Sequence, residues 1–190
     1  MVLAYLDIET YSPEKEPRFE DRVILIGLKI KKDVMLLKEW ESSEKNILSQ
    51  FYNFLKDRVE KETVTLIGWN LVRFDIPFLT YRIWKRNIDS LVNIFEVFRK
   101  TYWRDLRQCL LPFNEYRFRG LSEDEIAKKF GIKPPTYSNK EISYFYKNRM
   151  FGKIEEHIIS EFKFLSDLSW KMRDIREVMR VFESGEKTGT

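Results

Sequence analysis

The sequence predicts an α/β domain with a mixed central β-sheet flanked by α-helices. Short runs of β-branched and apolar residues in the first half give way to segments in which apolar residues recur at helical spacing. The order of these segments is three strands, a helix, a strand, and then mostly helices, which is an α/β plan built on a mixed sheet. A length of 190 residues is enough for one domain with a substantial core.

The first half of the chain contains the predicted strands. The second and third strands read as a hairpin that turns at residues 31–33, and Ser42 or Ser43 is the expected cap of the first helix. In that helix Ile47, Phe51 and Leu55 recur at helical spacing. The predicted elements are strands 2–9, 22–30, 33–40 and 63–69, a loop at 11–20, and helices 43–61 and 76–87.

The second half is predicted to be mainly helical. Ser122 and Glu125 form a capping-box pattern at the start of one helix, and Gly131 ends it. We expect one domain over 1–183 and a disordered tail over 184–190. The other predicted elements are a short strand or helix near 91–98, another element near 103–111, helix 122–130, a loop at 133–139, and a long helix at 141–183 interrupted at Gly152.

Composition limits the functional classes. The chain has 34 basic and 30 acidic residues, and this small basic excess is compatible with a polyanionic partner. Cys109 is the only cysteine, which excludes an intramolecular disulfide. Neither a signal-peptide pattern nor an apolar run near 18 residues is present, so we expect a cytoplasmic protein with no membrane association.

Two acids close the first predicted strand. Asp7 and Glu9 are separated by one residue, and side chains alternate along a strand, so both point to the same face. Two carboxylates on one face repel each other and lose hydration, a cost that a bound cation offsets. Their oxygen ligands suit Mg²⁺ or Mn²⁺. A strand that simply ends in solvated acids is the alternative interpretation.

A second motif follows the strand at 63–69. Asp75 lies just before a helix whose first turn contains Pro77, where a missing N–H is tolerated. Asp75 fits either an N-cap, the commonest role of Asp at such a position, or a third metal-site acid.

These motifs resemble a known family. Leu6-Asp7-Ile8-Glu9-Thr10, followed by Asn70-x-x-x-Phe74-Asp75-x-Pro77-Phe78-Leu79, is similar to the first two motifs of the DEDD 3′–5′ exonucleases, in the form found in the proofreading domain of family B DNA polymerases. The resemblance spans roughly residues 3 to 180. It implies a ribonuclease H-like fold, a free-standing exonuclease domain, and two divalent metal ions, Mg²⁺ or Mn²⁺, at the acids.

The third motif of the family departs from its pattern here. The family has an Asp on a late helix with Tyr or His four residues before it, and the best match is Asp167 with Lys163 in the Tyr/His position. A rival register pairs Glu161 with His157. At about 100° per residue Glu161 falls near the centre of the apolar stripe of this helix, and Asp167 lies about 130° away. Motif chemistry favours Asp167 and periodicity favours Glu161; we expect Asp167.

The resemblance also implies the reaction and the substrate contacts. A two-metal phosphodiester hydrolysis would release nucleoside 5′-monophosphates from a 3′ end, preferably of single-stranded DNA, with RNA as an alternative. Thr10, Asn70 and Phe74 would contact the terminal nucleotides. Trp103 and Arg104 belong to a segment of mixed cations and aromatics that suits a single strand. Replication or repair proteins are possible partners. A catalytically weak nucleic-acid-binding module is the competing function.

Overall fold

The computed structural model describes residues 1–13 and 18–183, so the predicted tail at 184–190 lies outside the described residues. The elements in chain order are β1 (Val2–Tyr11), β2 (Arg22–Ile30), β3 (Asp33–Lys38), the short 3-10 helix η1 (Glu39–Glu41), α1 (Glu44–Val59), β4 (Val64–Gly68), α2 (Asp75–Lys85), α3 (Leu91–Arg99), β5 (Thr101–Asp105), α4 (Leu106–Cys109), the 3-10 helix η2 (Leu111–Asn114), α5 (Glu123–Phe130), α6 (Asn139–Lys147), α7 (Phe151–Lys171) and α8 (Ile175–Glu183).

The five strands form one mixed sheet in the order β3-β2-β1-β4-β5. β1 pairs antiparallel with β2 and parallel with β4, and β5 pairs parallel with β4. The predicted α/β fold with a mixed central sheet is therefore confirmed. Because β1, β4 and β5 run in the same direction, their carboxyl ends lie along one edge of the sheet.

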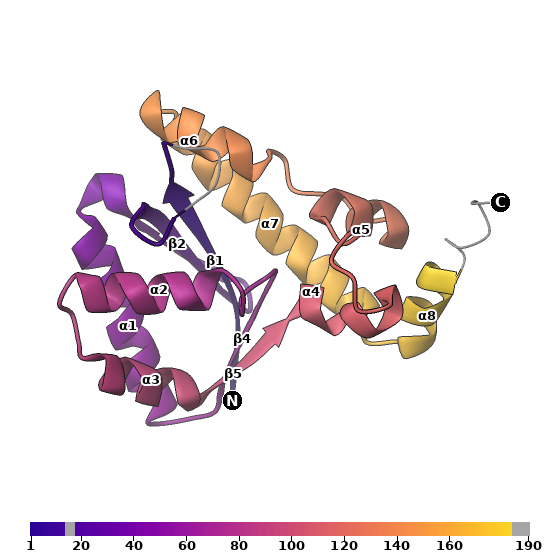
Figure 1. Ribbon diagram of the computed structural model, residues 1–190, viewed down its shortest axis with the longest axis horizontal. Coiled ribbons are helices and arrows are strands. Elements are labelled where there is room, and N and C mark those ends of the chain that lie inside the picture. The colour runs from indigo at the N-terminus through magenta and orange to yellow at the C-terminus, as the bar shows by residue number, and fades with distance from the viewer. Residues whose placement is uncertain (14–17, 184–190) are drawn as a thin grey trace.

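Helices cover both faces of this sheet (Figure 1). On one face α1, α2 and α3 enclose a core that includes Phe51, Phe78 and Ile94. On the other face α4 to α8 enclose a second core that includes Ile126, Ile158 and Val178. The result is a three-layer arrangement in which the sheet separates two hydrophobic cores.

The side-chain alternation of β1 decides which face the first two acids occupy. Leu6 and Ile8 belong to the core beneath α1 to α3, so Asp7 and Glu9 point to the opposite face, the one that α7 covers. Gly27 on β2 allows α7 to come close. A Cβ atom there would lie 2.5 Å from Cδ1 of Ile158.

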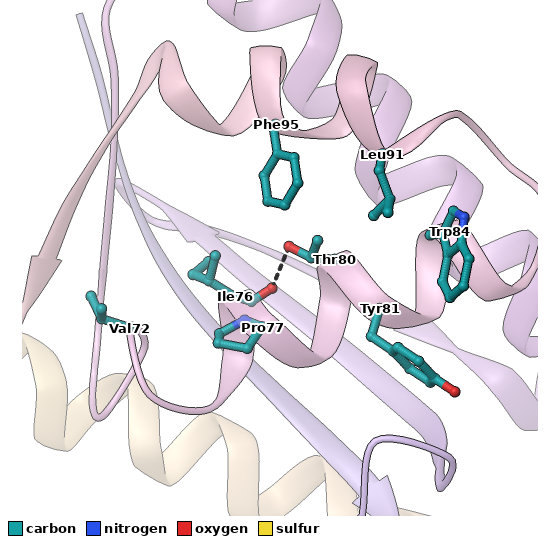
Figure 2. A pocket seen from close by; sticks show the side chains of 8 residues that line it. All are labelled: Val72, Ile76, Pro77, Thr80, Tyr81, Trp84, Leu91 and Phe95. Atoms are coloured by element: carbon teal, nitrogen blue, oxygen red, sulfur yellow. Dashed lines mark hydrogen bonds between the residues drawn. The ribbon is translucent and has the colours of Figure 1, made fainter.

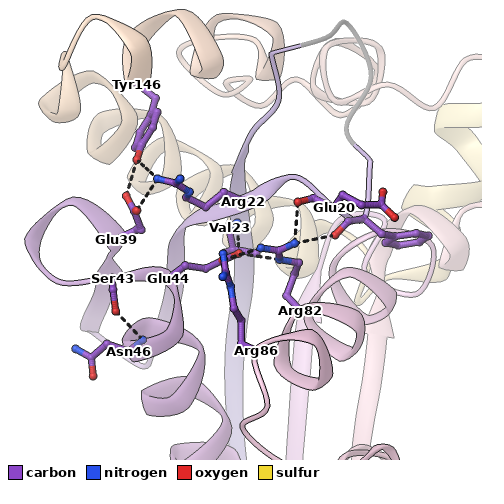
Figure 3. A network of polar contacts seen from close by, with 11 residues as sticks. Glu20, Arg22, Val23, Glu39, Ser43, Glu44, Asn46, Arg82, Arg86 and Tyr146 are labelled. Carbon is purple, nitrogen blue, oxygen red and sulfur yellow. Dashed lines mark hydrogen bonds and ion pairs between the residues drawn. The ribbon is translucent and has the colours of Figure 1, made fainter.

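A buried ion-pair network fixes α2 to α1 and β2 (Figure 3). Glu44 in the first turn of α1 accepts hydrogen bonds from Arg82 Nε at 2.8 Å and Nη2 at 2.7 Å, and it also pairs with Arg86. The backbone N–H of Val23 donates to the same carboxylate at 2.9 Å. Burial alone would raise the pKa of Glu44, but these hydrogen bonds reverse the effect and leave it lowered. The network holds the helix that begins at Asp75.

One local prediction was wrong, and one alternative is not observed. The expected helix 141–183 is three helices, and it breaks before α7 rather than at Gly152, which lies inside α7 with open space around it. The first break follows from Arg149, whose φ of 56° is incompatible with a continuing helix. Of the two roles left open for Asp75, the N-cap is not observed, because Phe74 occupies that position and Asp75 is the first helical residue. No described helix is long and apolar enough to span a bilayer.

Candidate metal centre

Four acids from three elements meet at the carboxyl end of β1. Asp7 and Glu9 come from β1 itself, Asp75 from the first turn of α2, and Glu161 from the middle of α7. Glu9, Asp75 and Glu161 are each at least 95% buried. Asp75 reaches the cluster because the loop after β4 starts beside the end of β1, to which β4 is parallel.

The pKa values of the four acids are raised, because the fold holds buried carboxyl groups close together. Burial raises the pKa of Asp7 to about 6, although a hydrogen bond with Glu161 acts in the opposite direction. Burial, followed by the charge of Asp7, raises the pKa of Glu9, Asp75 and Glu161 well above the ordinary values. Without a cation, part of the cluster therefore retains protons at neutral pH.

Glu123 is a fifth acid that sequence reasoning missed. It is the first residue of α5, directly after the cap Ser122, and it is half-buried. Burial and the charge of Asp7 raise its pKa to about 8, and the charge of Arg107 opposes this rise. An acid in the first turn of a helix is ordinarily explained by the helix dipole, so the sequence offered no signal for a role at the cluster.

His157, the only histidine of the chain, lies inside this cluster. Its Nε2 atom is 3.4 Å from Oε1 of Glu9 and 3.4 Å from Oε1 of Glu161. Burial lowers the pKa of His157 to about 4, so the imidazole is neutral at neutral pH. His157 and Glu161 are one helical turn apart and project from the same face of α7.

Unsatisfied oxygen atoms show that the cluster fits a cation. Within the described ranges, one carboxylate oxygen each of Asp7, Glu9, Asp75 and Glu161 is buried and accepts no hydrogen bond. Buried polar groups are almost always paired, and a group of acids that is not paired internally is matched to an external positive charge. Carboxylate oxygens are the ligands preferred by Mg²⁺ and Mn²⁺. These four residues fit a divalent metal centre.

Asp167 and Lys163 are not brought to the cluster. They form a surface ion pair with each other, 2.8 Å from Nζ to Oδ2, with 65% of the Lys163 side chain and 40% of the Asp167 side chain exposed. Because α7 is continuous from Phe151 to Lys171, Asp167 stays on a different face from Glu161. The structure thus places the alternative pair, His157 and Glu161, in the cluster and leaves the expected pair, Lys163 and Asp167, on the surface.

Asp105 holds the loop that precedes Asp75. Its carboxylate accepts hydrogen bonds from the backbone N–H groups of Asn70 at 3.0 Å and Val72 at 3.1 Å, while it also caps α4. Asn70 has a φ of 61°, a conformation that Asn tolerates better than most residues. Arg107 donates a 3.3 Å hydrogen bond to the Asn70 side chain. Sequence reasoning did not assign this positioning role to Asp105.

The other predicted contact residues lie in different environments. Thr10 is buried next to Glu9, after a bulge in the pairing of β1 with β2. Phe74 packs against Phe78 with ring centroids 5.3 Å apart. Trp103 meets Phe98 edge to face, under α3, whereas its neighbour Arg104 on β5 is half-buried. The structure places Asn70 beside the acid-bearing loop, and it gives Trp103 a packing partner.

Two arginines flank the acids. The guanidinium groups of Arg73 and Arg107 both lie over the ring of Phe118, at 4.3 Å and 5.1 Å from its centroid. The charge of Arg73 contributes to lowering the pKa of Arg107, after the larger effect of burial. Arg107 also interacts electrostatically with Glu123, so this pair of cations lies near the acid cluster, and guanidinium groups are good phosphate ligands.

An apolar hollow of about 440 Å³ lies between α2 and α3 (Figure 2). It begins at Val72 and Ile76, on either side of Asp75 in the sequence, and continues along exposed aromatic rings. Phe95 is 58% exposed and Trp84 is 43% exposed. The complete lining consists of Val72, Ile76, Pro77, Thr80, Tyr81, Trp84, Leu91 and Phe95.

Comparison with known proteins identifies the family and the fold of this chain. A model of the RNase H superfamily matches residues 4–161 of the chain. No curated protein matches the chain. Among solved structures, the family B DNA polymerase from the hyperthermophilic archaeon Pyrobaculum calidifontis superimposes with a TM-score of 0.66 at 14% identity, over 95% of this chain and 27% of the polymerase. At that identity the likeness is one of fold, and the chain spans about a quarter of the polymerase's length.

Proposed function

Because the chain belongs to the RNase H superfamily, we propose that it is a metal-dependent nuclease that removes nucleotides from the 3′ end of single-stranded DNA. The fold supports a nuclease-type function, and the convergence of four buried acids with unsatisfied oxygens supports the chemistry. In this proposal Asp7, Glu9, Asp75 and Glu161 bind two divalent cations, Mg²⁺ or Mn²⁺. Bound there, the cations would supply Lewis-acid stabilisation of phosphate charge and a more acidic water.

The residues around the acids have separate tasks in this proposal. Arg73 and Arg107 attract the phosphate that precedes the scissile bond, and Phe118 beneath them keeps both guanidinium groups at the site. Asp105 fixes the loop that carries Asn70, which places the Asn70 side chain beside the terminal nucleotide. Neither Asp105 nor Phe118 contacts the reacting atoms, so both are positioning residues.

The hollow between α2 and α3 supports an unpaired strand as the substrate. Bases of a single strand stack on exposed aromatic rings, a contact that a duplex with buried bases does not offer. The hollow is continuous with the loop before Asp75, so a strand whose 3′ end lies at the acids would pass over Phe95. DNA and RNA bases stack equally well there, and RNA is therefore the substrate to compare.

The competing function, a binding module with a disabled site, relied on Lys163 in the Tyr/His position. His157 precedes Glu161 by four residues and lies in the cluster, so the geometry does not favour that alternative.

The test is degradation of a 5′-labelled single-stranded DNA oligonucleotide with Mg²⁺, Mn²⁺ or EDTA, alongside RNA of the same sequence. We expect a metal-dependent ladder shortened from the 3′ end, its loss in Asp7→Ala, and its retention in Asp167→Asn. Binding of the oligonucleotide without cleavage at any metal concentration would instead identify a binding module.

A further inference from the structure

Nε2 of His157 faces carboxylate oxygens of two acids of the cluster. Nε2 of His157 lies 3.4 Å from Oε1 of Glu9, and that oxygen accepts no hydrogen bond from the described part of the chain. Oε1 of Glu161 lies at the same 3.4 Å distance from Nε2. One ligand atom from each of Glu9, His157 and Glu161 lies within 4.8 Å of the other two.

Such spacing is what ligands of one metal ion show. Two ligand atoms at about 2.1 Å from a common ion are about 3.0 Å apart at a right angle and about 3.4 Å apart at a tetrahedral angle. His157 and Glu161 are also one helical turn apart, and ligands at this i, i+4 spacing on one helix face bind a single ion. Glu9 completes the set from β1, on the opposite side.

We propose that His157 is a metal ligand together with Glu9 and Glu161, and that this nitrogen makes the site select Mn²⁺ over Mg²⁺. The inference rests on the proposed metal-dependent function. Mg²⁺ is a hard ion that is bound by oxygen, whereas imidazole is a good ligand for first-row transition ions. A site built only of carboxylates would have no such preference. In this proposal, His157 is the residue that determines which metal ion the site prefers.

Pulsed electron paramagnetic resonance on Mn²⁺ bound to the wild-type protein tests this directly. His157 is the only histidine, so after removal of any affinity tag a histidine nitrogen coupled to Mn²⁺ has one possible source. We expect a ¹⁴N coupling that changes to the ¹⁵N pattern when the protein is produced with ¹⁵N-histidine. Bound Mn²⁺ whose spectrum is the same with both isotopes overturns the inference and leaves the proposed function intact. Failure of the protein to bind Mn²⁺ overturns both.

A competition titration of Mn²⁺ against Mg²⁺ provides a second readout. His157→Gln replaces the nitrogen by an amide group of similar volume whose oxygen is a hard donor. We expect the ratio of Mn²⁺ to Mg²⁺ affinity to fall by about tenfold or more, since loss of even an outer partner of a ligand costs about 10–100-fold in metal affinity. Lys163→Gln, on the exposed face of the same helix, is the matched control and should leave the ratio unchanged. An unchanged ratio in a folded His157→Gln protein contradicts the proposal.

Discussion

Removing divalent cations and raising the pH should destabilise this protein, which is the opposite of the usual behaviour of acidic groups. The pKa of Glu123 is raised to about 8, and those of Glu9, Asp75 and Glu161 are raised well above their ordinary values. The folded protein therefore holds protons that the unfolded chain has already released. The stability that these acids contribute is greatest below their unfolded pKa values and is lost as pH rises through the folded ones.

The size of the effect follows from proton linkage. One proton bound in the folded state and absent from the unfolded state changes the free energy of unfolding by about 1.4 kcal/mol per pH unit. Between about pH 6.5 and 8, one such proton in the cluster gives a loss of about 2 kcal/mol. For a domain of this length that loss lowers the melting temperature by about 4–8 °C.

The lower limit of the window is set by His157. Burial lowers its pKa to about 4, so protonation of the unfolded chain makes the protein less stable as pH falls from about 6.5 towards 4. The slope of stability against pH that His157 contributes has the opposite sign to the slope contributed by the acids. Below pH 6.5 it would mask the contribution of the acids. Above pH 6.5 the unfolded histidine loses its remaining proton, so this opposing slope fades and is gone by about pH 7.5.

The assay is urea or thermal unfolding in EDTA across this pH window, repeated in saturating Mn²⁺. Cations compete with protons for the carboxylates, so with Mn²⁺ the stability should rise with pH. Glu161→Gln should reduce the slope of the metal-free protein, whereas Asp167→Asn should leave it unchanged. A metal-free protein whose stability is constant or increases from pH 6.5 to 8 would refute the reasoning, because the acids would then be ionised in the folded state.

Three further predictions concern individual side chains. Glu161→Gln should lower kcat/KM for 3′ shortening by about 10²–10³-fold, which is the cost typical of losing one group that stabilises transition-state charge. Asp167→Asn should remain active. If Asp167→Asn were the more damaging variant, Asp167 and not Glu161 would be the fourth acid. Glu44→Ala should destabilise the protein by about 3–5 kcal/mol in urea unfolding, because Arg82 is left buried without its partner, whereas loss of the exposed pair in Glu96→Gln should have little effect. Phe95→Ala should weaken binding of single-stranded DNA by about 1–3 kcal/mol in a fluorescence titration, with Mn²⁺ affinity unchanged.

Much of the fold could be predicted from the sequence because its elements carry local signals. The hairpin of β2 and β3, the cap Ser43 and the capping box at Ser122 all lie where the pattern indicated. The interruption expected at Gly152 occurs instead at Arg149, and the break between α7 and α8 was missed because no Pro or Gly marks it. The first break depends on the left-handed backbone of Arg149, which the residue type does not reveal.

Some residues of the candidate site could be predicted from local sequence patterns, and others could not. Asp7 and Glu9 follow from strand alternation, and Asp75 follows from its motif. Glu123 and Asp105 act through neighbours that are distant in sequence, and no pattern within their own helix or strand records that proximity.

The choice between Asp167 and Glu161 shows which kind of signal deserves more weight. Motif chemistry favoured Asp167, because the family acid is Asp, whereas helical periodicity placed Glu161 on the apolar face that packs against the sheet. A helix that continues without interruption from Phe151 to Lys171 fixes the face of every residue along it, and α7 is such a helix. The position of Asp167 on this helix keeps its side chain on the exposed face, whatever the chemistry of the side chain. The direction in which a side chain points is therefore a physical precondition for a metal ligand, and motif resemblance ranks only the residues that already satisfy it.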